Sequence, residues 1–293
     1  MRPATACHRA FALTLCLSAG IASAQVVSPP PPFFEPSVGQ AGKDVIWVPT
    51  PQALVDKMLN MAKATPKDYL IDLGSGDGRT VITAARRGIR AHGIEYNPDM
   101  VELSKRNAQA EGVAERATFA KEDLFDSDFS KATVITMFLL DRINLQLRPK
   151  LLNLAPGTRI VSNTFTMAEW KADEKVYATE KEGCESYCVA HLWIVPARVA
   201  GVWKMTQAVT QGELTLRQEF QTVSGQLVAG DKVLQVSGGR LRGDRLSFTA
   251  GGVDYTGRVR GEVIEGAGKG SGAWTAARIR KALPPPPETL QKS

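Results

Sequence analysis

A short apolar run followed by closely spaced glycines constrains the fold of this chain more than any other feature. Residues 69–81, YLIDLGSGDGRTV, lead from an apolar segment through Asp72 to Gly74, Gly76 and Gly78. Glycine weakens a strand or helix by roughly 0.5–1 kcal/mol relative to alanine, so such a cluster indicates a place where a ligand approaches the backbone closely. The pattern predicts a strand, a tight turn and the N-terminus of a helix, whose amide groups are free to face a ligand.

The surrounding sequence alternates between apolar runs and helical periodicity. We expect helices at 51–63, 80–88, 98–112 and 143–157, and strands at 69–73, 90–97, 116–123, 132–140 and 158–165. This alternation predicts a parallel sheet with helices on both faces. Two more strands, at 174–182 and 186–195, should form an antiparallel hairpin that completes the sheet edge. The predicted fold is a doubly wound, mostly parallel, seven-stranded α/β domain at 41–198.

The C-terminal third of the chain has a different character. Glycines recur every few residues from 202 to 280, between short runs in which apolar and polar residues alternate. This pattern predicts a small antiparallel all-β domain at 199–282, either a sandwich or a partial barrel. Residues 283–293 follow with a proline run and should be a disordered tail.

The N-terminus has the layout of a secretory signal. Arg2 and Arg9 precede an apolar stretch of 11 residues, and Ala-Ser-Ala precedes Gln25. We expect residues 1–24 to be a cleavable signal peptide, because the apolar stretch is too short to span a bilayer. Residues 25–40 are proline-rich and predict an extended linker. The expected location is periplasmic, with a retained leader that anchors the protein to a membrane as the alternative.

The charge of the chain is mildly basic. Removal of Arg2 and Arg9 with the leader leaves 34 of the 36 basic residues against 30 acidic ones, a formal charge of +4. The basic residues are spread along the chain without blocks, which does not favour a nucleic-acid partner but leaves association with an anionic membrane surface open.

Two cysteines remain after the leader, which contains Cys7 and Cys16. Cys184 and Cys188 are followed by His191. The pair can be two free thiols, a disulfide across a turn, or two ligands of a zinc site for which no fourth ligand lies nearby. We therefore predict no metal and leave the first two alternatives open.

The spacing of the glycines separates the ligand classes. A dinucleotide motif needs a small third residue at position 79, which is Arg79, and no Gly-Lys-Ser/Thr phosphate loop is present. Two carboxylates follow at the ends of the next two strands, Glu95 and Asp123. Each feature alone has a plainer interpretation, as a bare turn, a solvated strand end or a helix cap. Their order along successive strands favours one ligand pocket at the carboxyl edge of the sheet.

The motif D-x-G-x-G-x-G, from Asp72 to Gly78, resembles the first motif of the class I S-adenosylmethionine-dependent methyltransferases. The resemblance implies a Rossmann-like fold in which the cofactor's ribose hydroxyls bind Glu95 and its adenine amino group binds Asp123, with Tyr96 and Leu124 beside the ring. The cofactor-binding residues that it implies are Asp72, Gly74, Ser75, Gly76, Gly78, Glu95, Tyr96, Asp123 and Leu124.

Residues 41–170 resemble a narrower branch, the mitochondrial lysine methyltransferases that modify the ATP/ADP carrier and the c-ring protein of ATP synthase. This resemblance implies direct in-line methyl transfer from S-adenosylmethionine to a protein lysine, with no covalent enzyme intermediate. Two alternatives stay open, a small-molecule or lipid methyltransferase and a non-catalytic module that keeps the cofactor pocket. We name no catalytic residue, because an amine beside a sulfonium in a dry channel can lose its proton without a dedicated base.

Two segments have uncertain roles near the expected acceptor. The sequence TMFLLDRIN replaces the Asn/Asp-Pro-Pro-Tyr/Phe motif of nucleic-acid amino-methyltransferases, which disfavours base methylation. Phe138, Leu139 and Asp141 occupy this region and are candidates to line the acceptor entrance, although a buried strand end explains Phe138 and Leu139 equally well. Pro49 and Thr50 form either part of a lid over the cofactor or the start of a helix.

Overall fold

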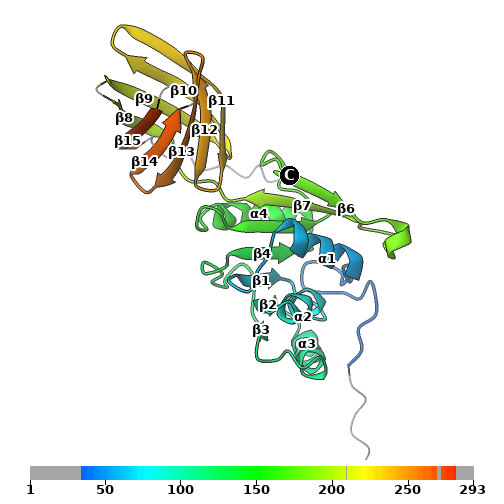
Figure 1. The fold of residues 1–293 in the computed structure, drawn as a ribbon. Helices are drawn as coiled ribbons and strands as arrows, with labels where there is room; N and C mark the ends of the chain where they lie inside the picture. Colours follow the sequence, from blue (N-terminus) through cyan, green and yellow to red (C-terminus); the bar gives the residue numbers. More distant parts are fainter. Residues whose placement is uncertain (1–33, 209, 269–271, 282–293) are drawn as a thin grey trace, which may run out of the picture. The chain divides into compact units, whose positions relative to one another are not determined.

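The computed structural model describes residues 34–208, 210–268 and 272–281 (Figure 1). The expected leader at 1–24, most of the expected linker at 25–40 and the expected tail at 283–293 lie outside the described residues. No helix of the described part is both long and apolar enough to cross a membrane.

Seven strands form a mostly parallel sheet, as expected. In the order β3-β2-β1-β4-β5-β7-β6, the strands are β3 (Ala117–Lys121), β2 (Arg90–Glu95), β1 (Tyr69–Leu73), β4 (Val134–Met137), β5 (Arg159–Asn163), β7 (Val189–Ile194) and β6 (Glu174–Tyr177). Strands β1 to β5 pair in parallel, while β7 is antiparallel to both β5 and β6. The predicted doubly wound α/β fold and its antiparallel hairpin are confirmed.

Helix α1 (Gln52–Met61) precedes β1, and three further helices connect strands: α2 (Arg79–Arg86), α3 (Pro98–Ala110) and α4 (Asp141–Leu151). The start of α3 follows from its sequence, because the Asn97 side chain accepts a hydrogen bond from the Asp99 amide and proline occupies the first helical position. Helix α4 differs most from the expectation. It starts two residues early and stops at Leu151, six residues before the expected end at Gly157.

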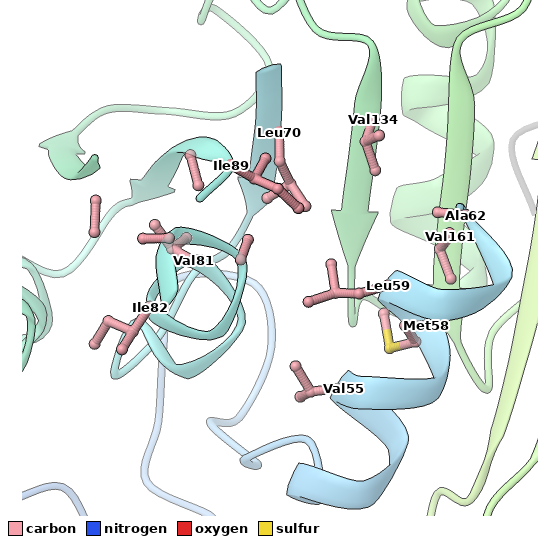
Figure 2. Packing of buried hydrophobic residues seen from close by; sticks show 14 of the residues in the cluster. Val55, Met58, Leu59, Ala62, Leu70, Val81, Ile82, Ile89, Val134 and Val161 are labelled. Carbon is pink, nitrogen blue, oxygen red and sulfur yellow. The ribbon is translucent and has the colours of Figure 1, made fainter. Parts of the chain in front are cut away.

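The core of the sheet follows the two-residue period of its strands. Leu70, Val134 and Val161 face the cluster formed with α1 and α2, whereas their neighbours Ile71, Ile135 and Ile160 belong to the cluster that includes α4. Figure 2 shows the first face, with residues of α1 such as Met58 and Leu59 packed beside β4 and β5. Both faces of the sheet are therefore buried, as a parallel sheet requires.

The C-terminal strands form a closed barrel of eight antiparallel strands, which are β8 (Gly201–Gln207), β9 (Thr210–Glu219), β10 (Thr222–Ala229), β11 (Lys232–Arg242), β12 (Arg245–Ala250), β13 (Val253–Arg260), β14 (Val263–Gly268) and β15 (Gly272–Lys281). The predicted antiparallel β domain is confirmed, but it is neither a sandwich nor a partial barrel, because β15 pairs with β8 and closes the sheet. Closure removes the exposed strand edges.

Large side chains fill the interior of the barrel. Trp203, Phe248, Tyr255 and Trp274 are at most 5% exposed and share one cluster. Gly266 makes room for this packing, because a Cβ atom there would lie 2.6 Å from Cε2 of Trp274. An eight-stranded barrel is just wide enough for its own side chains.

Cys184 and Cys188 form a disulfide. This observation decides between the alternatives that the sequence left open. Within the described residues, no group of three or more His, Cys, Asp and Glu side chains could hold a metal ion.

Candidate functional site

A cavity of about 580 Å³ opens at the carboxyl ends of the parallel strands, where open α/β sheets bind their ligands. The glycine turn after β1, residues 95–97 after β2, residues 122–124 after β3 and residues 137–140 after β4 all line it. A segment that precedes α1 also lines it, residues 40–50, which we call the strap. Sequence analysis missed most of the strap, proposing a lid role only for Pro49 and Thr50.

The first two glycines of the motif lie at the cavity wall. Gly74 and Gly76 have φ angles of +78° and +55°, in the region that favours glycine. A Cβ atom on Gly76 would lie 2.6 Å from Nε1 of Trp47, so this glycine also lets the strap pack over the turn. Gly78 is different, because it does not line the cavity. It precedes α2 with a φ of +82°, and a Cβ atom there would lie 2.8 Å from the ring of Phe119.

The amides of the glycine turn are largely occupied, contrary to the expectation of free donors. The Gly74 and Ser75 amides donate to the Ile94 carbonyl, and the Gly76 amide donates to Oε2 of Glu95 at 2.9 Å. The Arg79 amide at the start of α2 donates to Oδ1 of Asp77 at 3.2 Å. Carboxylates from the chain therefore already hold the positive end of this helix, where a phosphate would otherwise bind.

Asp72 is a buried acid at the end of β1, only 7% exposed. It accepts a hydrogen bond from Oγ1 of Thr136 at 2.6 Å. Burial raises its pKa to about 7, and the nearby charges of Asp77 and Glu95 act in the same direction. The carboxyl group is therefore partly protonated at neutral pH.

Glu95 is the last residue of β2, as expected, and Asp123 lies two residues after the end of β3. Glu95 accepts hydrogen bonds from the amides of Gly76 and Asn97, each at 2.9 Å, so it braces two loops at the cavity wall. Asp123 accepts from the Phe125 amide at 3.0 Å and pairs with Lys43 of the strap. The hydrogen bond from Lys43, followed by that from Phe125, lowers the pKa of Asp123.

The two side chains expected beside an adenine ring also line the cavity. Tyr96 is 48% exposed, and the Lys43 ammonium lies 4.8 Å from the centre of its ring. Leu124, the next residue after Asp123 in the sequence, also lines the cavity. Of the nine predicted cofactor residues, all but Gly78 line this one cavity.

Acidic side chains outnumber basic ones around the cavity. The lining carries Asp44, Asp72, Asp77, Glu95, Glu122 and Asp123, but only two basic residues, Lys43 and Arg79. Both basic residues are paired, Lys43 with Asp123 and Arg79 with Asp77. This electrostatic environment suits a ligand with positive charge better than a phosphate.

S-adenosylmethionine fits these residues. It carries a sulfonium and an ammonium group that an acidic cavity attracts, and its ribose and adenine supply partners for carboxylates. The buried Oγ atom of Ser75 has no hydrogen-bond partner within the described structure, and it lies against Gly93 of β2, where an added Cβ atom would be 2.5 Å from it. The chain thus offers donors, acceptors and close backbone approach without a phosphate site.

Three aromatic side chains line another part of the cavity, and we call Phe138, Phe165 and Tyr187 the aromatic cluster. The ring centres lie 5.2 Å apart for Phe138 and Tyr187, 6.0 Å for Phe138 and Phe165, and 6.4 Å for Phe165 and Tyr187. Sequence analysis considered only Phe138. The other two come from distant segments, and no local pattern joins them.

The other residues that the sequence suggested near the acceptor or the cofactor differ in whether they line the cavity. Leu139 lines the cavity and lies against Gly74, where a Cβ atom would be 3.2 Å from its side chain. Asp141 is outside the lining, since it begins α4 and accepts a hydrogen bond from the Thr166 amide at 2.7 Å. Pro49 and Thr50 line the cavity and also lead into α1.

Comparison with known proteins identifies relatives of the sheet domain. The family model described as the ANTKMT methyltransferase domain matches residues 72–174. A protein-lysine N-methyltransferase of Saccharolobus islandicus is 43% identical over 135 residues, which are 45% of this chain and 84% of that protein. The mouse adenine nucleotide translocase lysine N-methyltransferase is 32% identical over 119 residues, 40% of this chain and 52% of that protein.

A solved structure also matches this part of the chain. An RNA methyltransferase from Salinibacter ruber, crystallised with S-adenosyl-L-homocysteine, shares 44% sequence identity with a TM-score of 0.48. The match covers 52% of this chain and 96% of that one.

Proposed function

The chain belongs to the ANTKMT methyltransferase domain family, and from that premise we propose that it transfers a methyl group from S-adenosylmethionine to a lysine side chain of a protein. The observation that carries the proposal is the 43% identity to a protein-lysine N-methyltransferase, of which the chain covers 84%. The acidic cavity supports it, because a lysine approaches as a cation.

The cofactor contacts that we propose are those that the resemblance implies, and the shared cavity lining supports them. Glu95 would accept hydrogen bonds from the ribose hydroxyl groups, and Asp123 would accept one from the adenine amino group, with Tyr96 and Leu124 beside the ring. Gly74, Ser75 and Gly76 lie against the amino-acid part, near the buried carboxyl of Asp72. When bound, the cofactor supplies an electrophilic methyl group on a sulfonium.

The chain's own residues have to deliver a neutral amine to that methyl group. A lysine starts from a pKa of about 10.4. The exclusion of water and the positive charge of the neighbouring sulfonium disfavour the ammonium form and lower this pKa, so an acceptor that enters the cavity as a cation can lose its proton before transfer. Positioning and the exclusion of water then provide most of the acceleration, so that no described residue has to act as a general base.

Transfer of a radioactive methyl group identifies the chemical class of the acceptor. The purified full chain is incubated with methyl-labelled S-adenosylmethionine and a membrane extract, and the labelled protein is hydrolysed. We expect labelled methyl-lysine, and its loss with a Glu95→Ala variant. Label confined to the organic phase would instead identify a lipid or small-molecule acceptor.

Calorimetry separates an enzyme from a non-catalytic binding module. The wild-type chain should give saturable heat on titration with S-adenosylmethionine, and the Asp72→Ala variant should bind more weakly. If neither protein gave saturable heat at millimolar cofactor, the methyltransferase hypothesis would be rejected. A non-catalytic binding module would then be the remaining hypothesis.

We further propose that the protein is exported. The leader pattern of residues 1–24 supports this, and so does the Cys184–Cys188 disulfide, because disulfides persist in oxidising compartments. Fractionation of cells that express the full chain, beside a variant without residues 2–24, tests the location. Recovery of both proteins in the cytosol, with free thiols, would contradict export.

A further inference from the structure

Two members of the aromatic cluster lie at or directly after a residue with a positive φ angle, which residues other than glycine rarely adopt. Tyr187 has a φ of +53°, and Thr164, directly before Phe165, has a φ of +59°. The Phe165 amide donates to the Asn163 carbonyl at 2.7 Å, which closes a three-residue turn around Thr164. Bulky and β-branched residues adopt positive φ only where the surroundings enforce it, and such positions concentrate at ligand sites.

The Cys184–Cys188 disulfide encloses Tyr187 in a short loop. Cys184 is 1% exposed and packs in the core cluster that includes α1. Just before it, the Thr179 amide and hydroxyl donate to Glu182, which also pairs with Lys57 of α1 at 2.8 Å. The base of the loop is therefore fixed to the core, while Tyr187 remains 41% exposed at the cavity wall.

The three aromatic residues come from three adjacent strands. Phe138 follows β4, Phe165 comes two residues after the end of β5, and Tyr187 comes two residues before β7. Since β4, β5 and β7 are neighbours in the sheet, their ends meet at one edge. Aromatic faces attract cations, and the same cavity carries an excess of carboxylates.

We propose that the disulfide-closed loop presents Tyr187 as one wall of a binding site for a cationic alkylammonium group, with Phe138 and Phe165 as the other walls. Tyr187 contacts the ligand, while Cys184 and Cys188 are positioning residues that act through it. The inference rests on the proposed function and deepens it, because the group bound is the charged end of the methyl acceptor.

A matched pair of probes tests the site without turnover. Choline and 3,3-dimethylbutan-1-ol have nearly the same shape, but only choline is charged. Each is titrated into the full chain saturated with S-adenosyl-L-homocysteine, and binding is followed by calorimetry. We expect choline to bind at least about fivefold more tightly than the neutral alcohol, as a cation–π contribution requires. Equal affinities for the two probes would overturn the proposal.

Variants then assign the binding to the loop. Tyr187→Ala should weaken choline binding by about 5- to 30-fold, whereas Tyr187→Phe should keep it, because the ring face makes the contact. Tyr177→Ala is the control, since Tyr177 is 63% exposed on β6 and outside the cavity lining. Affinity for S-adenosyl-L-homocysteine should stay within about twofold in all three. The proposal fails if Tyr187→Ala binds choline as tightly as Tyr177→Ala does.

The double variant Cys184→Ser, Cys188→Ser tests the positioning role. It should lose choline affinity to the same degree as Tyr187→Ala while it retains affinity for S-adenosyl-L-homocysteine, which reports an intact fold. Unchanged choline affinity would remove the disulfide from the proposal.

The outcomes distinguish this inference from the proposed function. Methyl-lysine formation in the extract assay, with Tyr187→Ala and Tyr177→Ala binding choline alike, would leave the enzyme activity standing and reject the cation site. Choline binding that depends on Tyr187, without any methyl-lysine, would keep the cation site and reject the lysine acceptor.

Discussion

Thr136 donates a hydrogen bond to Asp72 across adjacent strands, with 2.6 Å between Oγ1 and Oδ1. The two residues are register partners in the pairing of β1 with β4. This one side-chain donor favours the carboxylate, but burial outweighs it and leaves the pKa of Asp72 at about 7. The acid at the base of the cavity therefore changes its charge in the physiological range.

Asp72 makes the stability of the fold depend on pH. An aspartate in the unfolded chain has a pKa of about 3.9, whereas the folded value is raised to about 7. The stabilising contribution is complete below pH 4 and is lost progressively as the pH rises to about 7, because the unfolded chain ionises while the folded protein has to keep its proton or bury a charge. The loss approaches about 4 kcal/mol, from three pKa units.

Urea unfolding at pH 5, 6.5 and 8 measures this effect. The wild-type protein should lose stability over this range, and Asp72→Asn should lose much less. Parallel curves for the two proteins would show that Asp72 ionises normally in the folded state.

Gly76 should be intolerant of a side chain for two reasons. Its φ of +55° costs an alanine about 1–2 kcal/mol, and the added Cβ would lie 2.6 Å from Nε1 of Trp47. Gly112→Ala is the matched control, because Gly112 has a φ of +65° but nothing within 4 Å of an added Cβ.

Thermal unfolding should show that both glycine variants lose a similar amount of stability from the unfavourable φ angle. Only Gly76→Ala should also weaken S-adenosyl-L-homocysteine binding, by about tenfold or more, because displacement of Trp47 disturbs the strap. Equal cofactor affinity in the two variants would mean that the strap does not contribute to the site.

Glu95 should contribute to cofactor affinity through its hydrogen bonds as well as through its charge. Glu95→Ala removes the acceptor of two backbone amides as well as the proposed ribose contact. Since hydrogen bonds to a charged group contribute about 1.5–3 kcal/mol each, we expect cofactor affinity to fall by at least about tenfold. Glu122→Ala removes a carboxylate from the same cavity lining and should change the affinity by less than about threefold. Calorimetric titration of both variants with the cofactor measures this difference. Equal losses of affinity would show that the negative charge, and not the hydrogen bonds of Glu95, determines cofactor binding.

Two buried tryptophans of the barrel should respond differently to the same substitution. Nε1 of Trp203 donates to the Val199 carbonyl at 2.8 Å, whereas Nε1 of Trp274 has no hydrogen-bond partner among the described residues. Trp203→Phe leaves a buried carbonyl unpaired and should cost about 1–3 kcal/mol more than Trp274→Phe. Denaturant unfolding of the two variants compares these costs, and equal losses would show that packing alone decides.

Local patterns predicted much of the sheet domain. The run from Tyr69 to Leu73 and the glycines after it correctly indicated a strand and a turn, because both depend on neighbours in the sequence. The parallel sheet followed from the alternation of strands and helices. The carboxylates at the ends of β2 and β3 could likewise be placed at one edge, since parallel strands end on the same side.

The sequence was least informative where a residue's role depends on what packs against it. Gly78 belongs to the motif, yet the side chains of Phe119 and Ser104 fill the space beside it and the cavity lies elsewhere. The amides of the turn were expected to be free, but Glu95 and Asp77 occupy two of them. Asp141, which the sequence suggested for the acceptor entrance, accepts a hydrogen bond from the loop that contains Thr166.

The sequence by itself determined the order of elements, the glycine turn and the chemical kinds of residue at each strand end, because these depend on contacts between close neighbours along the chain. Only the tertiary structure decided that Phe138, Phe165 and Tyr187 meet, that Cys184 and Cys188 are joined and that the barrel closes. Each of these needs segments brought together by strand pairing and burial, and local periodicity carries no information about which distant segment becomes the neighbour.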